Sequence, residues 1–150
     1  MTKPKIIIYT DGGSRGNPGV AGAGALITNT EGKVLAETFQ ALGVMTNNEA
    51  EYQGVILGLG LLKKTINKDQ VHNYEVELRL DSELVANQLK GTYQLKEEKL
   101  FPLFIKIWNL QVKDLPKFSI KHIPREENAL ADKLANRAMD ESGGLKQALL

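Results

Sequence analysis

Residues 5–19, KIIIYTDGGSRGNPG, decide how the rest of the chain is interpreted. The isoleucines at 6–8 do not alternate with polar residues, which predicts a strand over Lys5–Thr10 that is buried on both faces. That strand ends at Asp11, and the following segment up to Gly19 contains four glycines, which is typical of a loop. A buried strand that ends in a carboxylate suggests chemistry at that edge of a sheet.

Strands and helices continue in a mixed order after this opening. Further strands are expected at 21–28, 33–42, 74–80 and 117–123, and helices at 46–64, 82–89, 95–112 and 126–139. This order predicts an α/β fold with a mixed sheet and helices packed on it. The expected apolar helix faces are Val55, Leu59, Leu62, Leu100, Leu103, Phe104, Ile107, Trp108, Leu130, Leu134 and Ala138.

Composition predicts a single domain in a reducing compartment. The chain has 150 residues, 42% hydrophobic and 25% charged, with a net charge of +1 and no cysteine. These values exclude disulfides, thiolate nucleophiles and cysteine zinc sites, and no apolar run reaches the roughly 18 residues that span a bilayer. We therefore expect a cytoplasmic location and no membrane partner. Because no strongly basic field exists, any site for a polyanion must be local.

Four acidic residues stand where the expected elements begin or end: Asp11, Glu51, Asp81 and Asp132. Strand ends and helix starts converge on one edge of such a sheet, and ligand sets made only of oxygen suit Mg²⁺ or Mn²⁺ rather than zinc. Each residue also has an ordinary explanation as a turn former, helix cap or solvated side chain. Spacing alone leaves both interpretations open.

Glu49 competes with Glu51 for a place in such a site. The two residues point about 200° apart on a helix. Glu51 lies four residues before Val55 and continues the apolar stripe, so it should face the sheet, whereas Glu49 should be solvated. Geometry therefore favours Glu51.

Four motifs, in order, resemble those of type 1 ribonuclease H over about residues 5–139. They are YTDGGS at 9–14 with GNPG at 16–19 and GAGA at 22–25, TNNEAE at 46–51, LDS at 80–82, and HIPREENALADKLA at 122–135. The resemblance implies a ribonuclease H-like five-stranded mixed sheet, three antiparallel strands and then two parallel, flanked by helices. It also implies a metal-dependent endonuclease that hydrolyses the RNA strand of RNA–DNA hybrids, leaving 5′-phosphate and 3′-hydroxyl ends.

The resemblance also assigns roles to individual residues. It implies that Asp11, Glu51, Asp81 and Asp132 bind Mg²⁺ or Mn²⁺, with two ions in the substrate complex and a two-metal mechanism. It places a proton-carrying histidine at His122. Contacts to the nucleic-acid backbone are implied for Gly12, Gly13, Ser14, Asn17, Thr46, Asn47, Asn48 and Ser82.

The chain departs from well-known members in lacking a basic hairpin rich in tryptophan and lysine, which indicates a handle-less branch. We expect a monomeric, free-standing enzyme with a catalytic domain at 1–140. Residues 142–144 are expected to be a linker within a tail at 141–150 that packs on the body or is disordered, with docking on a partner as the alternative. Competing hypotheses are a nuclease that also cuts double-stranded RNA, a non-catalytic hybrid-binding module, and a domain of a reverse transcriptase or transposase-related protein.

Overall fold

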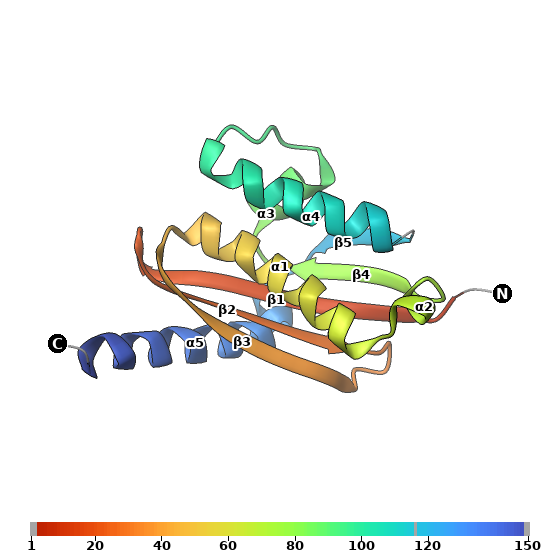
Figure 1. Cartoon of the computed structure of the whole chain (residues 1–150), viewed down its shortest axis with the longest axis horizontal. Coiled ribbons are helices and arrows are strands. Elements are labelled where there is room, and N and C mark those ends of the chain that lie inside the picture. The colour runs from red at the N-terminus through yellow and green to blue at the C-terminus, as the bar shows by residue number, and fades with distance from the viewer. Residues whose placement is uncertain (1–2, 116, 149–150) are drawn as a thin grey trace.

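The computed structural model describes residues 3–115 and 117–148, with side-chain surroundings up to Glu141. Its centre is one five-stranded sheet in the order β3-β2-β1-β4-β5 (Figure 1). The strands are β1 (Lys5–Gly16), β2 (Gly19–Thr28), β3 (Val34–Met45), β4 (Glu75–Leu80) and β5 (Phe118–His122). The first three are antiparallel, while β4 runs parallel to β1 and β5 parallel to β4. This confirms the predicted mixed sheet.

Helices cover both faces of the sheet. They are α1 (Asn47–Thr65), α2 (Lys68–Val71), α3 (Glu83–Lys90), α4 (Phe101–Asp114) and α5 (Ala129–Ala148), with short 3-10 turns η1 (Glu98–Leu100) and η2 (Arg125–Asn128). α1 packs against the face that carries Ile8 and Ala25, whereas α5 packs against the opposite face at Gly24. The sequence missed α2, a single helical turn.

The glycine-rich segment 11–19 is not the loop that its composition predicted. β1 continues through it as far as Gly16, which pairs with Gly19 at a tight turn into β2. The glycines serve close packing: a Cβ on Gly12 would lie 2.0 Å from the carbonyl oxygen of Ala50, at the start of α1. A Cβ on Gly54 would likewise lie 2.6 Å from the carbonyl oxygen of Asp11, so α1 packs closely on β1 at this position as well.

The main core lies between the sheet and α1, α3 and α4. It contains Ile8, Tyr52, Leu78 and Leu80, each with essentially no exposed surface, as well as the predicted Val55, Leu59, Leu62, Leu100 and Ile107. Two predicted core residues are wrong: Trp108 is 52% exposed and Leu130 is 54% exposed. Both lie on amphipathic helices, where a sequence period gives a stripe but not its exact width. Pro102 lies in the first turn of α4, where its missing N–H costs the helix no hydrogen bond.

The helix ends agree with the sequence in one case and differ in another. α3 ends at Gly91, which has a positive φ of 80° and caps the helix, close to the end predicted at residue 89. The linker expected at 142–144 is wrong, because α5 continues through it to Ala148. Two glycines cost a helix only about 1 kcal/mol each, so they do not have to end it. No helix in the described part of the chain is both long and apolar enough to cross a membrane.

Candidate active site

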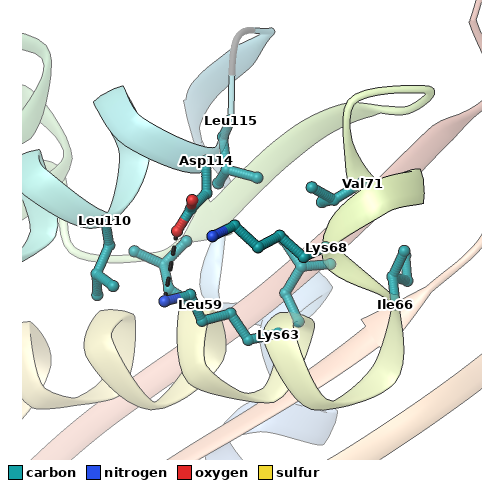
Figure 2. A pocket seen from close by; sticks show the side chains of 9 residues that line it. Leu59, Lys63, Ile66, Lys68, Val71, Leu110, Asp114 and Leu115 are labelled. Carbon is teal, nitrogen blue, oxygen red and sulfur yellow. Dashed lines mark ion pairs between the residues drawn. The ribbon is translucent and has the colours of Figure 1, made fainter.

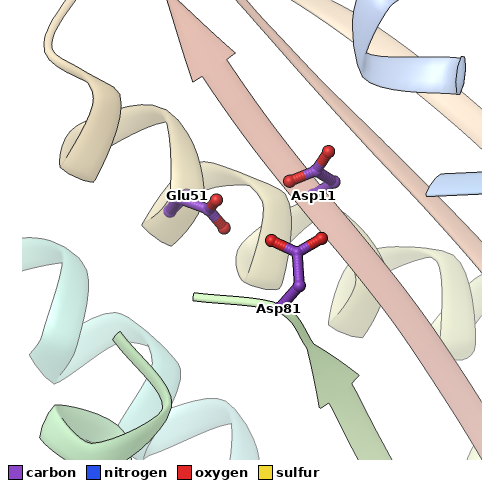
Figure 3. Close-up of side chains that lie close together, drawn as sticks. All are labelled: Asp11, Glu51 and Asp81. Atoms are coloured by element: carbon purple, nitrogen blue, oxygen red, sulfur yellow. The ribbon is translucent and has the colours of Figure 1, made fainter. Parts of the chain in front are cut away.

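Three carboxylates converge at one edge of the sheet (Figure 3). Asp11 comes from β1, Glu51 from the first turns of α1, and Asp81 directly follows β4. Each offers one oxygen, and these oxygens all lie within 4.8 Å of one another. The three side chains point into a common space, the arrangement that a single cation requires of its ligands.

The fold brings these residues together through strand register and helix packing. β1 and β4 are parallel neighbours in which Tyr9 pairs with Arg79, so Asp11 and Asp81 follow at equivalent positions. α1 begins with a capping box in which the hydroxyl of Thr46 accepts from the Glu49 N–H, and the Glu49 carboxylate accepts in return from the Thr46 N–H. Glu49 is therefore occupied in the cap, and Glu51 is the residue directed at the cluster.

The cluster is electrostatically strained in the absence of a counter-ion. Burial raises the pKa of the Asp11 carboxyl from 3.8 to about 7, and the charges of Asp81 and Asp132 act in the same direction. Burial also raises the pKa of Glu51 well above its ordinary value, followed by the charges of Asp11 and Asp81. The Glu51 Oε2 is buried and has no hydrogen-bond partner among the described residues. A divalent cation would offset the repulsion between the carboxylates and give the Glu51 Oε2 a partner.

Asp132 and His122 are both exposed and lie outside the three-residue cluster. Asp132 is in the first turn of α5 and is exposed, and it is not part of the three-residue group, although it acts on the pKa of Asp11 by charge and hydrogen bonding. His122 is exposed at the end of β5, where it pairs with Leu80, the residue before Asp81. The sequence-predicted set thus divides into three converging carboxylates and two exposed neighbours.

The predicted substrate contacts also hold the fold together. The main-chain N–H of Ser14 donates to Asn47 Oδ1 at 2.9 Å, and the Asn47 N–H donates to Asn17 Oδ1 at 3.1 Å. Thr46 caps α1, and the Ser82 hydroxyl caps α3 by accepting from Val85 at 3.2 Å. Of the remaining residues, Gly12 is buried, whereas Gly13 and Asn48 are half-buried. The β1–β2 turn and the start of α1 therefore form one linked surface.

Sequence reasoning missed two residues of this site. Asn128 is 1% exposed, and its Nδ2 donates to the main-chain oxygen of Thr10 at 2.9 Å and to Asp81 Oδ2 at 3.0 Å. The positive charge of Arg125 opposes the other influences on Glu51 and lowers its pKa. Both residues lie in the last of the four motifs, at 122–135. Their residue types alone do not show that η2 places them beside the carboxylates.

Comparison with known proteins defines the class. The profile of the reverse transcriptase-like family matches residues 9–138. A ribonuclease HI of Pseudomonas syringae pv. tomato is 31% identical over 95% of this chain and 97% of its own length. The chain therefore belongs to the reverse transcriptase-like family and, by its similarity to this relative, to the ribonuclease H family.

Two further similarities refine this assignment. A bifunctional protein of Mycobacterium tuberculosis is 41% identical over 91% of this chain, which spans only 36% of that protein. The crystal structure of LC11-RNase H1 in complex with an RNA/DNA hybrid superimposes with a TM-score of 0.88 at 46% identity, covering 92% of this chain and 99% of the other. The chain thus spans about a third of the length of its mycobacterial relative, whereas the fold of LC11-RNase H1 is matched almost completely.

Proposed function

We propose that this chain is a metal-dependent endonuclease that hydrolyses the RNA strand of RNA–DNA hybrids, leaving 5′-phosphate and 3′-hydroxyl ends. The observation that carries the proposal is the convergence of Asp11, Glu51 and Asp81, whose oxygens lie within 4.8 Å of one another. Like charges at this spacing destabilise a fold unless a bound cation offsets them. Family membership and the hybrid bound by LC11-RNase H1 support the choice of substrate.

The donor set fits Mg²⁺ or Mn²⁺. Asp11, Glu51 and Asp81 offer hard carboxylate oxygens, and the Glu51 Oε2 has no other partner among the described residues. Asp132 adds a fourth, exposed carboxylate. We propose that two ions are bound when the substrate is present. Such ions supply an activated water and neutralise charge at the scissile phosphate.

The protein's own groups position these ligands and the substrate. Asn128 donates a hydrogen bond to Oδ2 of Asp81 and so restrains the orientation of this carboxylate beside the cluster. His122 is exposed at the end of β5, the strand beside β4. It carries protons to or from the open edge of the site. The linked surface of Ser14, Asn17 and Asn47 offers short amides and main-chain groups, which suit the sugar-phosphate backbone and its 2′-hydroxyl because they can donate and accept.

The test uses three end-labelled duplexes of one sequence: RNA–DNA, RNA–RNA and DNA–DNA. Each is incubated with Mg²⁺, Mn²⁺ or EDTA, with native protein, with Asp81→Asn and with Asp69→Asn. Asp69 is an exposed carboxylate of α2 and serves as the matched control. Cutting of only the hybrid's RNA strand, dependent on metal and lost in Asp81→Asn alone, is the expected result.

Other outcomes would select the competing hypotheses. Cutting of RNA–RNA as well would broaden the substrate, and binding of hybrid without cutting would make the chain a binding module. Equal activity of Asp81→Asn at saturating Mg²⁺ would overturn the site assignment. The catalytic domain at 1–140, the tail at 141–150, the monomeric state, the handle-less branch and the cytoplasmic location remain predictions within this proposal.

A further inference from the structure

The outer face of α4 carries a stripe of exposed large hydrophobic residues. Phe101 is 41% exposed, Ile105 56%, Trp108 52% and Val112 57%. Their spacing of i, i+4, i+7 and i+11 places them on one side of the helix, along about 16 Å of its axis. We call these four residues the α4 stripe. The opposite side of α4, with Ile107, already packs on the core, so the helix is apolar on two sides.

A basic flank runs along one edge of the α4 stripe. Lys106 and Lys113 are exposed and one heptad apart, and neither forms an ion pair within the described residues. Together with Lys63 and Ile105 they line a shallow hollow of about 440 Å³ beside the stripe.

One acidic residue, Asp114, also lines this hollow, but it is paired with another lysine. Asp114 pairs with Lys63 at 3.3 Å, and its side chain is only 11% exposed. This ion pair lies beside the apolar cavity between α1, α2 and the end of α4 (Figure 2). The positive charge of Lys106 and Lys113 therefore remains available to a partner.

We propose that the α4 stripe and its basic flank bind one amphipathic helix of another protein, with an apolar face and an acidic edge. Scattered exposed apolar side chains are ordinary, but four in helical register make a continuous surface. Helices recognise such surfaces through anchors at i, i+4 and i+7. Opposite charge along the edge sets the orientation and excludes other partners.

The dimensions of the surface favour a helix over a second copy of this chain. Four half-exposed side chains of this size offer on the order of 400 Å², half of the roughly 800 Å² that each partner buries in a stable complex, so the surface fits a weak, reversible contact with one helix rather than a stable dimer. Consider, moreover, a two-fold dimer in which the two α4 helices pack antiparallel. The basic flanks of both helices then lie on the same side of the pair. Lys106 and Lys113 of one copy would then face the lysines of the other, which is unfavourable.

Chemistry also separates a protein helix from nucleic acid and from lipid. Nucleotide bases stack on aromatic rings, but Ile105 and Val112 have no such ring and require an apolar counterpart. An interfacial helix sinks one face into the headgroups while its other face is polar. The other face of α4 is instead packed against the body of the protein.

Trp108 provides a direct measurement, because it is the single tryptophan of the chain. The probe is a capped synthetic helix of about 18 residues with leucine at i, i+4, i+7 and i+11 and glutamate along one edge. Control peptides carry lysine at the glutamate positions, or serine at the leucine positions. We expect the acidic peptide to shift Trp108 emission to the blue with saturable binding, at least tenfold tighter than the lysine peptide.

Two variants of the chain test both parts of the surface. Ile105→Ser with Val112→Ser should abolish the shift while hybrid cleavage and thermal unfolding stay unchanged, since both residues are more than half exposed. Lys106→Glu with Lys113→Glu should reverse the preference toward the lysine peptide. Reversal in this variant supports the proposal even if the serine variant folds poorly.

Several results would overturn the proposal. They are equal binding of both charged peptides, no binding of the acidic peptide up to about 1 mM, or an emission shift given only by anionic vesicles or only by hybrid. Sedimentation that shows a dimer lost in the serine variant would assign the surface to self-association instead. Peptide binding, its charge preference and sedimentation do not depend on nuclease activity, so these results stand apart from the proposed function.

Discussion

The side-chain amide of Asn128 donates a hydrogen bond of 3.0 Å to Oδ2 of Asp81 and thereby joins the turn before α5 to the end of β4. The same nitrogen donates to the main-chain oxygen of Thr10 at 2.9 Å. One buried amide thus connects the strand ends that carry Asp11 and Asp81. Its position makes Asn128 a positioning residue for the proposed reaction.

Asn128→Ala should lower both stability and turnover. Removing the amide leaves the buried Thr10 carbonyl without this donor and frees the Asp81 carboxylate, at a cost of about 1–3 kcal/mol. Thermal unfolding and steady-state cleavage of hybrid measure the two effects. Asn73→Ala, which changes an exposed asparagine, is the control and should leave both unchanged. A normal turnover number in Asn128→Ala would show that Asp81 needs no such support.

The metal-free protein should lose stability as the pH rises from about 4 to about 7. The folded-state pKa of Asp11 is raised from 3.8 to about 7, so the folded state binds more protons than the unfolded state across this interval. The stability is fully present below the unfolded pKa and is lost as the pH rises through the folded one. Denaturant unfolding in EDTA measures this, and Asp11→Asn should flatten the slope. An unchanged slope in Asp11→Asn would assign the pH dependence to other groups.

Divalent metal should raise the melting temperature of the native protein at neutral pH. An ion that binds only the folded state stabilises it in proportion to the logarithm of its concentration. Glu51→Gln should weaken this response. Without metal, Asp81→Asn should melt above the native protein, because one repulsive charge is gone. Calorimetry in EDTA and in increasing Mg²⁺ tests both statements, with Asp69→Asn as the charge-matched control.

Two glycine substitutions should have opposite effects. A Cβ on Gly12 would lie 2.0 Å from the Ala50 carbonyl oxygen, so Gly12→Ala must push α1 from the sheet and should destabilise by about 3 kcal/mol or more. Gly60, also in α1, has nothing within 4 Å of the same position. Gly60→Ala should therefore stabilise the fold by about 1 kcal/mol through helix propensity. Urea unfolding of both variants decides the matter, and equal effects would refute the packing explanation.

Much of the fold was predictable because burial leaves regular patterns. The isoleucines at 6–8 marked the central strand, and the alternation of Val76, Leu78 and Leu80 marked its parallel neighbour. Composition gave the wrong prediction where a glycine allows close packing of a helix rather than flexibility of a loop. Gly12 is typical of a loop, yet it lies in a paired strand because α1 approaches too closely for a Cβ.

The candidate site was predictable in its residues but not in its geometry. Glu51 could be separated from Glu49 by helical period, and the structure directs Glu51 to Asp11 and Asp81 while Glu49 closes the helix cap. The exposure of Asp132 and the burial of Asn128 depend on how η2 and α5 meet the sheet. That contact joins residues more than a hundred positions apart, as the Asn128–Thr10 hydrogen bond shows, and no local pattern encodes it.

The pairing of β1 with β4 has a consequence for synthesis on the ribosome. Tyr9 and Arg79 are register partners although 70 residues separate them. A nascent chain whose translation has not passed residue 81 holds at most two of the three converging carboxylates, and it also lacks Asn128. The order of translation thus withholds the candidate catalytic centre until β4 has been synthesised and has paired with β1.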